Sequence, residues 1–192
     1  MVHRVPGPID VRKVQSSPSA LQFVSSTAIS AAATVVVTGL EVGFDYIIQL
    51  EAFAPATDGQ SLWMRWSDDA GVSYEAGASD YSWGGNMNGI ATNDPSDSEI
   101  ALSGTSTVGN DATSLSSFKI DMINPNASDE QTTTIWQGFI MDTQATQEVI
   151  MFNGGGRFLQ GTDAVDAVQF LWSGGGNFKA QGDVTVWKRK RS

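Results

Sequence analysis

The stretch FDYIIQLEAF (residues 44–53) decides the fold class, because its side chains alternate with the two-residue period of a β-strand. We expect one face of this strand to be buried and the other to face solvent. The expected inner residues are Tyr46, Ile48, Leu50 and Ala52, and the expected outer residues are Ile47, Gln49 and Glu51. Nothing in this stretch repeats with the period of an amphipathic helix, so the sequence predicts a sheet with one buried face.

Similar short segments recur along the chain, separated by turn clusters. The expected strands are 34–40, 44–53, 61–66, 118–123, 132–141, 147–152, 167–172 and 183–188, with 21–26, 80–85 and 99–102 as weaker candidates. About eleven strands at this spacing predict an all-β fold, a jelly-roll-like antiparallel two-sheet sandwich, over a seven-stranded immunoglobulin domain. The polar region 86–115 is expected to form long loops with one short strand. The glycine runs at 152–158 and 173–178 are expected at hairpin tips, since neither has the sequence context of a phosphate-binding loop.

Composition excludes several kinds of chemistry. The chain has no cysteine, which excludes disulfides, cysteine-ligated zinc and thiol catalysis. His3 is the only histidine, so neither a multi-histidine metal site nor a Ser-His-Asp triad can be built. Hydrolysis by a pair of carboxylates stays open. We expect no enzyme activity and assign no catalytic and no metal-binding residues.

The charge is divided unevenly along the chain. The total is −10, but residues 1–19 carry +2, residues 188–191 carry +4, and the region between them carries −16. An acidic body repels nucleic acid and anionic membranes. We therefore expect neither as a partner, and no stretch is apolar enough to insert in a membrane or to serve as a secretory signal.

These features suggest three parts. Residues 1–19 are expected to be an extended N-terminal arm outside the domain, residues 20–187 the sandwich, and residues 188–192 a basic tail. The arm residues expected to attach to a neighbour are Arg4, Pro6, Pro8, Arg12 and Lys13, and those of the tail are Lys188, Arg189, Lys190 and Arg191. The alternative for the tail is a plain solubilising role.

The segment RWSDDAGVSYEAGASDYSW (residues 65–83) carries a turn motif. Ser67, Asp69, Gly71, Ser73 and Tyr74 fit S-x-D-x-G-x-[ST]-[WFY], the pattern of the Asp-box hairpin. The aspartate accepts hydrogen bonds from the turn's own NH groups, the glycine allows a positive φ, and the aromatic residue packs under the loop. We therefore expect a structural role for these residues.

Calcium binding is the alternative reading of this acidic region, with no other cofactor expected. Asp58, Asp68, Asp69 or Asp80 would supply the ligands. A calcium loop usually places more oxygen ligands at alternating positions than this segment does, which favours the turn.

The six tryptophans fall into two groups. Trp66, Trp136 and Trp172 lie among apolar residues in strand patterns, and we expect them in the core. Trp63, Trp83 and Trp187 are expected on outer faces or in loops. An exposed tryptophan suits a subunit interface or a platform that stacks on a sugar ring, and both readings stay open.

Three motifs together resemble a domain of uncharacterised phage and prophage virion proteins. They are ATDG (56–59), AGASDY (76–81) and AVDAVQFLWSGGG (164–176), and the likeness extends over roughly residues 20–187. The chain departs from that family at both ends, with its own proline-rich arm and a WKRKRS terminus.

The resemblance implies a β-sandwich module of a bacteriophage virion and does not imply an enzyme. We expect a tail-fibre or tail-tip component that docks through its N-terminal arm and displays the sandwich on the particle surface. Its partners would be other virion proteins and copies of itself in a homo-oligomer, with host surface glycan as a further candidate, and it would be assembled in the host cytoplasm. The alternatives are a capsid decoration protein that stabilises the major capsid lattice, and a carbohydrate-binding module.

Overall fold

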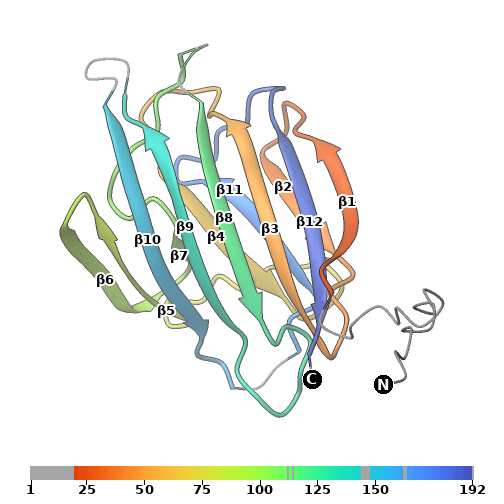
Figure 1. Ribbon diagram of the computed structural model, residues 1–192. Helices are drawn as coiled ribbons and strands as arrows, with labels where there is room; N and C mark the ends of the chain where they lie inside the picture. The colour runs from red at the N-terminus through yellow and green to blue at the C-terminus, as the bar shows by residue number, and fades with distance from the viewer. Residues whose placement is uncertain (1–19, 112, 114, 144–147, 162–163, 192) are drawn as a thin grey trace, which may run out of the picture.

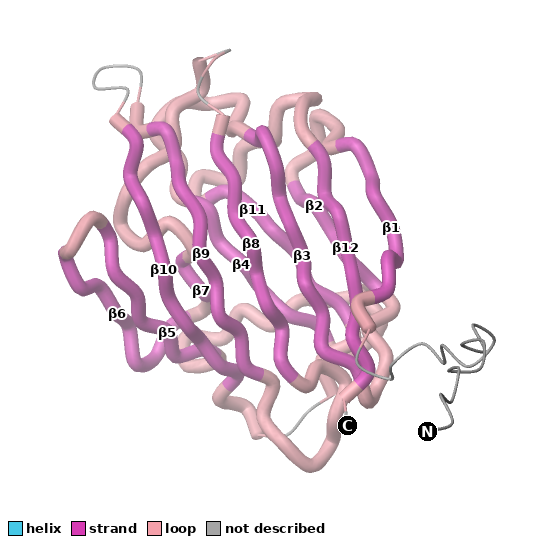
Figure 2. The backbone as a smooth tube through the Cα atoms, viewed as in Figure 1, coloured by secondary structure: helices cyan, strands magenta, loops and turns pink. Residues whose placement is uncertain are grey.

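The computed structural model describes residues 20–111, 113, 115–143, 148–161 and 164–191 as strands and loops, with no helix among them (Figure 2). No described segment is a helix long and apolar enough to span a membrane. The strands are β1 (Gln22–Ala28), β2 (Thr34–Thr38), β3 (Phe44–Phe53), β4 (Leu62–Ser67), β5 (Tyr81–Met87), β6 (Ile90–Asp97), β7 (Ile100–Ala101), β8 (Ser116–Ile123), β9 (Thr133–Met141), β10 (Val149–Phe158), β11 (Ala167–Trp172) and β12 (Asp183–Lys190).

The strands form two antiparallel sheets packed face to face (Figure 1). The larger sheet has the order β1-β12-β3-β8-β9-β10-β5-β6, and the smaller has the order β2-β11-β4-β7. The chain alternates between the sheets from β1 to β4 and again from β11 to β12, as expected of a jelly roll. The hairpins β5–β6 and β9–β10 widen only the larger sheet, whose outer face is turned toward the viewer in Figure 1. The expected all-β sandwich is confirmed.

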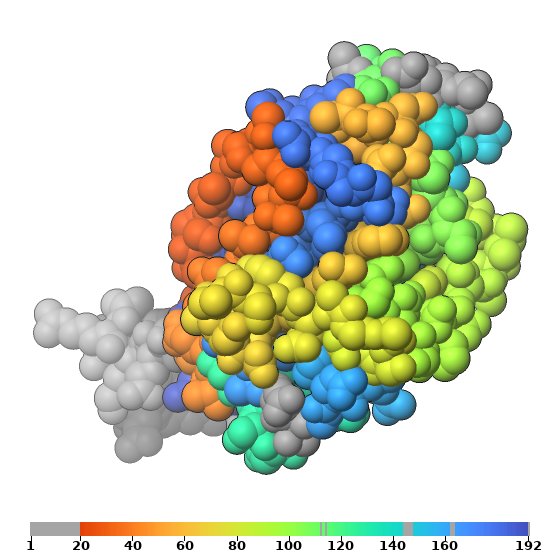
Figure 3. Space-filling model, turned by 180° about the vertical axis from the view of Figure 1, so that it is seen from behind, coloured from red at the N-terminus to blue at the C-terminus, as the bar shows by residue number. Residues whose placement is uncertain are grey.

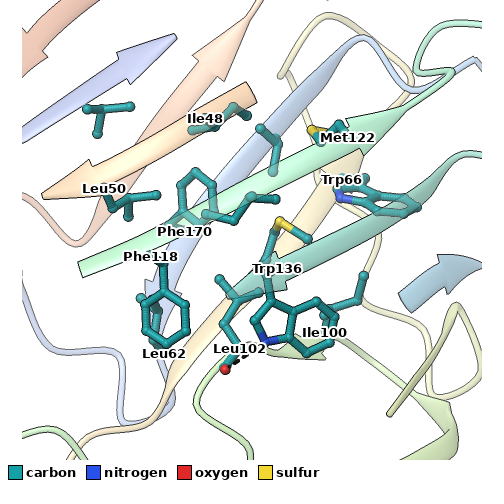
Figure 4. Packing of buried hydrophobic residues seen from close by; sticks show 14 of the residues in the cluster. Ile48, Leu50, Leu62, Trp66, Ile100, Leu102, Phe118, Met122, Trp136 and Phe170 are labelled. Atoms are coloured by element: carbon teal, nitrogen blue, oxygen red, sulfur yellow. Dashed lines mark hydrogen bonds between the residues drawn. The ribbon is translucent and has the colours of Figure 1, made fainter. Parts of the chain in front are cut away.

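The core lies between the two sheets and is built by the alternation that the sequence shows. Ile48 and Leu50 from β3 meet Phe118 from β8 and Phe170 from β11, and all four are buried (Figure 4). Full burial of each such side chain contributes roughly 1.5–3 kcal/mol. The core tryptophans Trp66, Trp136 and Trp172 are buried as expected.

The strand β3 departs from its expected alternation at one position. Ala52 has a φ of 54°, and the register with β8 shifts between Leu50 and Phe53. The irregularity takes Ala52 out of the inner row and puts Phe53 there, fully buried. The inner position expected for Ala52 is therefore wrong, because a period-two pattern gives no sign of a bulge.

Two other expectations about strands are wrong. Residues 152–158 are not a hairpin tip: Gly154, Gly155 and Gly156 lie within β10, between β9 and β5. Region 86–115 contains β6 and β7 in place of one short strand. The second glycine run does form a turn, closed by the Gly175 NH donating to the Trp172 carbonyl.

Candidate functional site

The Asp-box segment folds as a self-contained turn after β4. Ser67 Oγ donates to Asp69 Oδ1 at 2.7 Å and accepts from the Gly71 NH at 2.9 Å. Asp69 also accepts from the NH of Ser73 at 2.9 Å and from its hydroxyl at 2.6 Å. Gly71 has a φ of 81°, where a side chain would be strained. The side-chain oxygens of Ser67, Asp69 and Ser73 all form hydrogen bonds inside the turn.

The turn is also braced against the smaller sheet. The Ala70 NH donates to both carboxylate oxygens of Asp166, at 3.0 and 2.9 Å, and the Asp166 NH donates to the Ser67 carbonyl at 2.9 Å. Tyr74 is half-buried, with its hydroxyl close to Gly71. Seen from behind, the loop is the group of yellow atoms over the molecule (Figure 3). These contacts give the five motif residues structural roles.

Hydrogen bonding in the turn lowers the pKa of Asp69 to about 2, and the two bonds from Ser73 are the largest cause. The carboxylate is stabilised in its charged form by donors that only the folded turn supplies. The strength of this turn therefore depends on Asp69 being ionised.

Three of the four aspartates considered as calcium ligands have separate partners. Asp58 accepts from the Asn110 NH at 3.1 Å, and buried Asp80 accepts from Gln160 Nε2 at 2.7 Å and from the Gly77 NH. Asp69 serves its turn, and Asp68 is exposed beside it. Within the described ranges, no three His, Asp or Glu side chains gather in a way that could hold a metal ion.

The tryptophans expected on outer faces do not share one surface. Trp83 is only 8% exposed, and its Nε1 donates to Asp97 Oδ2 at 2.9 Å, so the expectation that it is exposed is wrong. Trp187 lies on the outer face of the larger sheet, and Trp63 on the outer face of the smaller one. No platform built from all three exists.

The basic C-terminal residues belong largely to the sheet. β12 extends to Lys190 and pairs with β3 up to Phe44, so the boundary expected after Trp187 falls inside a strand. Lys188 pairs with Glu41 and lies 4.5 Å from the centre of the Phe44 ring.

The remaining basic side chains of this end also have partners. Arg189 pairs with Asp45 at 3.1 Å, and Arg191 with Glu130 at 3.5 Å. A basic tail free to grip a neighbour is therefore not observed, because acids of the body hold three of its four cations. The arm residues Arg4, Pro6, Pro8, Arg12 and Lys13 lie outside the described residues.

On the outer face of the larger sheet, a row of directly paired residues crosses all eight strands. We call it the apolar row after its large side chains, Phe23, Trp187, Ile47 and Ile135. Residues paired directly across neighbouring strands follow one another in the order Phe23, Trp187, Ile47, Asp121, Ile135, Gly155, Gly84 and Asn93. At about 4.8 Å per strand this row is roughly 34 Å long. Phe23 and Trp187 stack edge to face with centroids 6.5 Å apart, and Ile135 is 55% exposed. Apolar side chains that face water in an ordered row indicate a contact surface.

A polar row runs beside the apolar row. The same pairings give the order Ser26, Thr185, Gln49, Lys119, Gln137, Asn153 and Asn86. Lys119 pairs with Asp121 at 2.7 Å. The side-chain amides of Gln49, Gln137 and Asn153 have no hydrogen-bond partner among the described residues. They are aligned and available for an external partner.

Three shallow hollows lie along these two rows. One of about 430 Å³ lies over Gln49, Lys119, Gln137, Phe139 and Met151. A second of about 390 Å³ lies between Lys119, Ile135 and Asn153. A third of about 390 Å³ lies over Gly84, Gly155 and Arg157. The two rows and the three hollows lie on one side of the sheet, so we name the outward residues of β1, β12, β3, β8, β9, β10 and β5 the sheet face.

The sequence patterns contained the residues of the sheet face without revealing it. The alternation puts Ile47 and Gln49 on an outer side, but which residues of other strands lie beside them depends on strand order and register. One signal was available in the sequence. The residues two positions from Ile135 on either side share its face of the strand and are polar, which indicates that Ile135 faces outward.

No family model matches the sequence, and no curated protein matches it significantly.

Proposed function

We propose that the chain is a non-enzymatic structural protein of a bacteriophage particle, associated with the tail, and that the sheet face packs against a neighbouring virion subunit. The observation that carries the proposal is the ordered apolar row with its hollows. Ile135 and Met151 are both 55% exposed, and Phe23 is 64% exposed, on one continuous face. Burying such side chains against a partner is favourable at about 25 cal/mol per Å².

The residues that carry the phage resemblance support a shared fold. Asp80 of AGASDY accepts the Gly77 NH, and Asp166 of AVDAVQFLWSGGG accepts the Ala70 NH. Gly59 of ATDG has a φ of 77°. Because these positions define turns, a family with this sandwich fold needs them for folding. The residues that recognise its binding partners lie at other positions.

Attachment to the particle is assigned to residues 1–19 together with the sheet face. Acids of the body pair with three of the four basic residues at the C-terminus, whereas residues 1–19 carry a net charge of +2, which suits an acidic neighbour. Ordering such a segment costs about 1–2 kcal/mol per residue, so it requires burial against a partner.

Immunogold electron microscopy of purified particles tests the proposal. An antibody raised against residues 20–191 should label the tail. Labelling of the head would favour the alternative, a decoration protein on the capsid lattice, and would defeat the tail assignment. Particles that contain no trace of the chain by mass spectrometry would defeat both.

A second candidate function, binding of a neutral host-surface glycan, is favoured by the polar row. Gln49, Gln137 and Asn153 offer unpartnered amide donors and acceptors beside apolar Ile135, which is the combination that sugar rings require. Lys119, the charged residue of this row, is paired with Asp121 of the apolar row, which suits an uncharged ligand.

A glycan array followed by calorimetry tests the second candidate. The paired change Gln137→Ala and Asn153→Ala should abolish any binding that the native chain shows. Gln22→Ala, which removes an exposed amide outside the row, should leave it unchanged. A native chain that binds no glycan on the array would remove this candidate and leave the subunit interface untouched.

A further inference from the structure

An apolar groove of about 350 Å³ lies beside the free edge of β2, on the inward side of β1. Val35 and Val37 of β2 form one wall, and Val184 and Val186 of β12 form another. The two valines of β2 pack against the core, but they are only half-buried. The groove therefore marks a place where the smaller sheet ends before the larger one does.

The strand β1 extends beyond the edge of the smaller sheet. Ser25 and Thr27 are paired with the buried residues Val186 and Val184, so their side chains point to the inside of the sandwich. Thr27 is nevertheless exposed, and Ser25 is only half-buried. Among the described residues, no strand lies opposite this inward side of β1, and one further strand beside β2 would occupy that place.

The four edge strands of the two sheets are protected unequally. At one end of the sheets, β6 carries Asp94, Pro95 and Asp97, and β7 has only two residues. Short strands, charges and proline all keep an edge from pairing with another strand. At the other end, β1 (QFVSSTA) and β2 (TVVVT) contain neither charge nor proline. Every residue of β2 is β-branched, so β2 is the edge best suited to pair with another strand.

We propose that the free edge of β2 binds an extended, uncharged segment of a partner protein, which adds as a fifth strand to the four-stranded sheet and fills the groove. Backbone hydrogen bonds to β2 supply affinity in this mode of binding, and side chains at alternate positions supply specificity. The groove lies on the inner side of the larger sheet, away from the sheet face, so this inference does not rest on the proposed function.

The lining of the groove defines the chemistry of the bound segment. The lining residues are valines, serines, threonines, Ala28, Gly39 and Tyr46, and none of them is charged, although the chain carries a net charge of −10. A charged side chain placed there would lose its hydration and find no opposite charge. Small apolar residues at every second position of the segment match the valines of both walls.

The groove accepts a single strand better than it accepts a second folded copy of this chain. An edge strand of a folded copy is attached to a neighbouring strand and is covered by a second sheet. The strand β1 lies over the place where these would have to fit. A single extended segment needs only the width of one strand, about 4.8 Å.

Fluorescence anisotropy of a labelled peptide tests the proposal in the full chain. The peptide alternates threonine and valine over the length of β2 and carries a lysine at each end for solubility. Thr27→Trp puts a large side chain into the groove, and the matched control Ser26→Trp puts one on the opposite side of the same strand. We expect the native chain and Ser26→Trp to bind the peptide, and Thr27→Trp to bind it at least about tenfold more weakly. Failure of the native chain to bind, or equal binding by the two variants, would overturn the proposal.

Two N-methylated forms of the peptide distinguish an added strand from a simple apolar ligand. One form is methylated at the amides of its valines and the other at the amides of its threonines, and in an extended strand these two sets of amides point to opposite edges. Only one edge of an added strand faces β2, so one form should lose about tenfold in affinity while the other keeps it. Equal affinities of the two forms would show that no backbone pairing takes place.

Hydrogen exchange locates the bound peptide. Exchange should slow by roughly fivefold or more at those amides of residues 34–38 that point away from β11, and it should stay unchanged in residues 90–97 at the protected edge. Slowing confined to residues 22–28 would place the peptide on β1 and contradict the assignment to β2. The measurement uses the isolated chain, so its outcome is independent of the location of the chain on a particle.

Discussion

The backbone NH of Trp66 donates a 2.8 Å hydrogen bond to Tyr81 Oη, and the two rings pack edge to face with centroids 5.7 Å apart. The same hydroxyl donates to the Glu75 carbonyl at 3.1 Å. Both rings are fully buried, so one phenol closes the base of the Asp-box loop from inside the core. Burial accordingly raises the pKa of Tyr81 far above its ordinary value.

Replacing Tyr81 by Phe is expected to destabilise the fold by about 1–3 kcal/mol, because the buried NH of Trp66 loses its acceptor. Urea unfolding followed by tryptophan fluorescence measures the change. Tyr74→Phe is the matched control, since the half-buried Tyr74 hydroxyl makes no hydrogen bond within the described residues. Equal midpoints for the two variants would contradict the role of the Tyr81 hydroxyl.

Two adjacent glycines of β10 should respond differently to replacement by alanine. A Cβ on Gly154 would lie 2.4 Å from Trp136 Cζ2, whereas a Cβ on Gly155 would approach only the Thr134 carbonyl, at 3.4 Å. We expect Gly154→Ala to cost about 1–3 kcal/mol through overpacking, and Gly155→Ala to be close to neutral. Thermal unfolding of both variants checks this, and similar losses would mean that the inward phase of Gly154 is wrong.

The C-terminal strand gives a prediction that separates the contribution of backbone pairing to stability from the contribution of the basic side chains. Deleting residues 188–192 removes pairing of β12 with Tyr46, Asp45 and Phe44, and should cost roughly 1–3 kcal/mol. Changing Lys188, Arg189, Lys190 and Arg191 to Gln keeps the strand, and each exposed ion pair that is lost should cost only ~0.2–1 kcal/mol. Chemical denaturation compares the two, and a deletion without effect would restore the view of a detached tail.

The Asp69 turn predicts a dependence of stability on pH. Its folded pKa of about 2 lies below the ordinary value of 3.8, so ionised Asp69 stabilises the folded state. This contribution is fully present above pH 4 and is lost as the pH falls from about 4 towards 2. Native stability minus that of Asp69→Asn, measured by denaturation between pH 2 and 6, should shrink over this interval. A difference that stays constant with pH would contradict the ionised turn.

The fold could be predicted from the sequence wherever one face of a strand is buried and the other faces solvent. The segments 44–53 and 167–172 were placed with their observed bounds because apolar residues mark their inner faces. The strand β6, IATNDPSD, was missed because it lies at the edge of the sheet and buries little. Local propensity indicates a turn for the glycines of β10. They lie in a strand because the neighbouring strands pair with it and because glycine leaves room for Trp136, and neither cause can be read from local sequence.

The site was less accessible to sequence reasoning than the fold. The Asp-box residues could be found because their hydrogen bonds are local in sequence. The sheet face joins Trp187 to Ile47 and Ile135, which are far apart in the chain and become neighbours only through the strand order. Trp83 is expected on an outer face or in a loop, although its phase relative to Tyr81 indicates the core, where it lies.

Oxidative footprinting of intact particles tests the central claim most directly. Trp187 and Trp63 are both half-buried in the isolated chain and lie on opposite outer faces, which makes them a matched pair. If the sheet face packs against a virion subunit, hydroxyl-radical labelling of Trp187 and Met151 should fall in the particle relative to the free chain, while Trp63 keeps its labelling. Undiminished labelling of Trp187 and Met151 in the particle, or particles without the chain, would contradict the account.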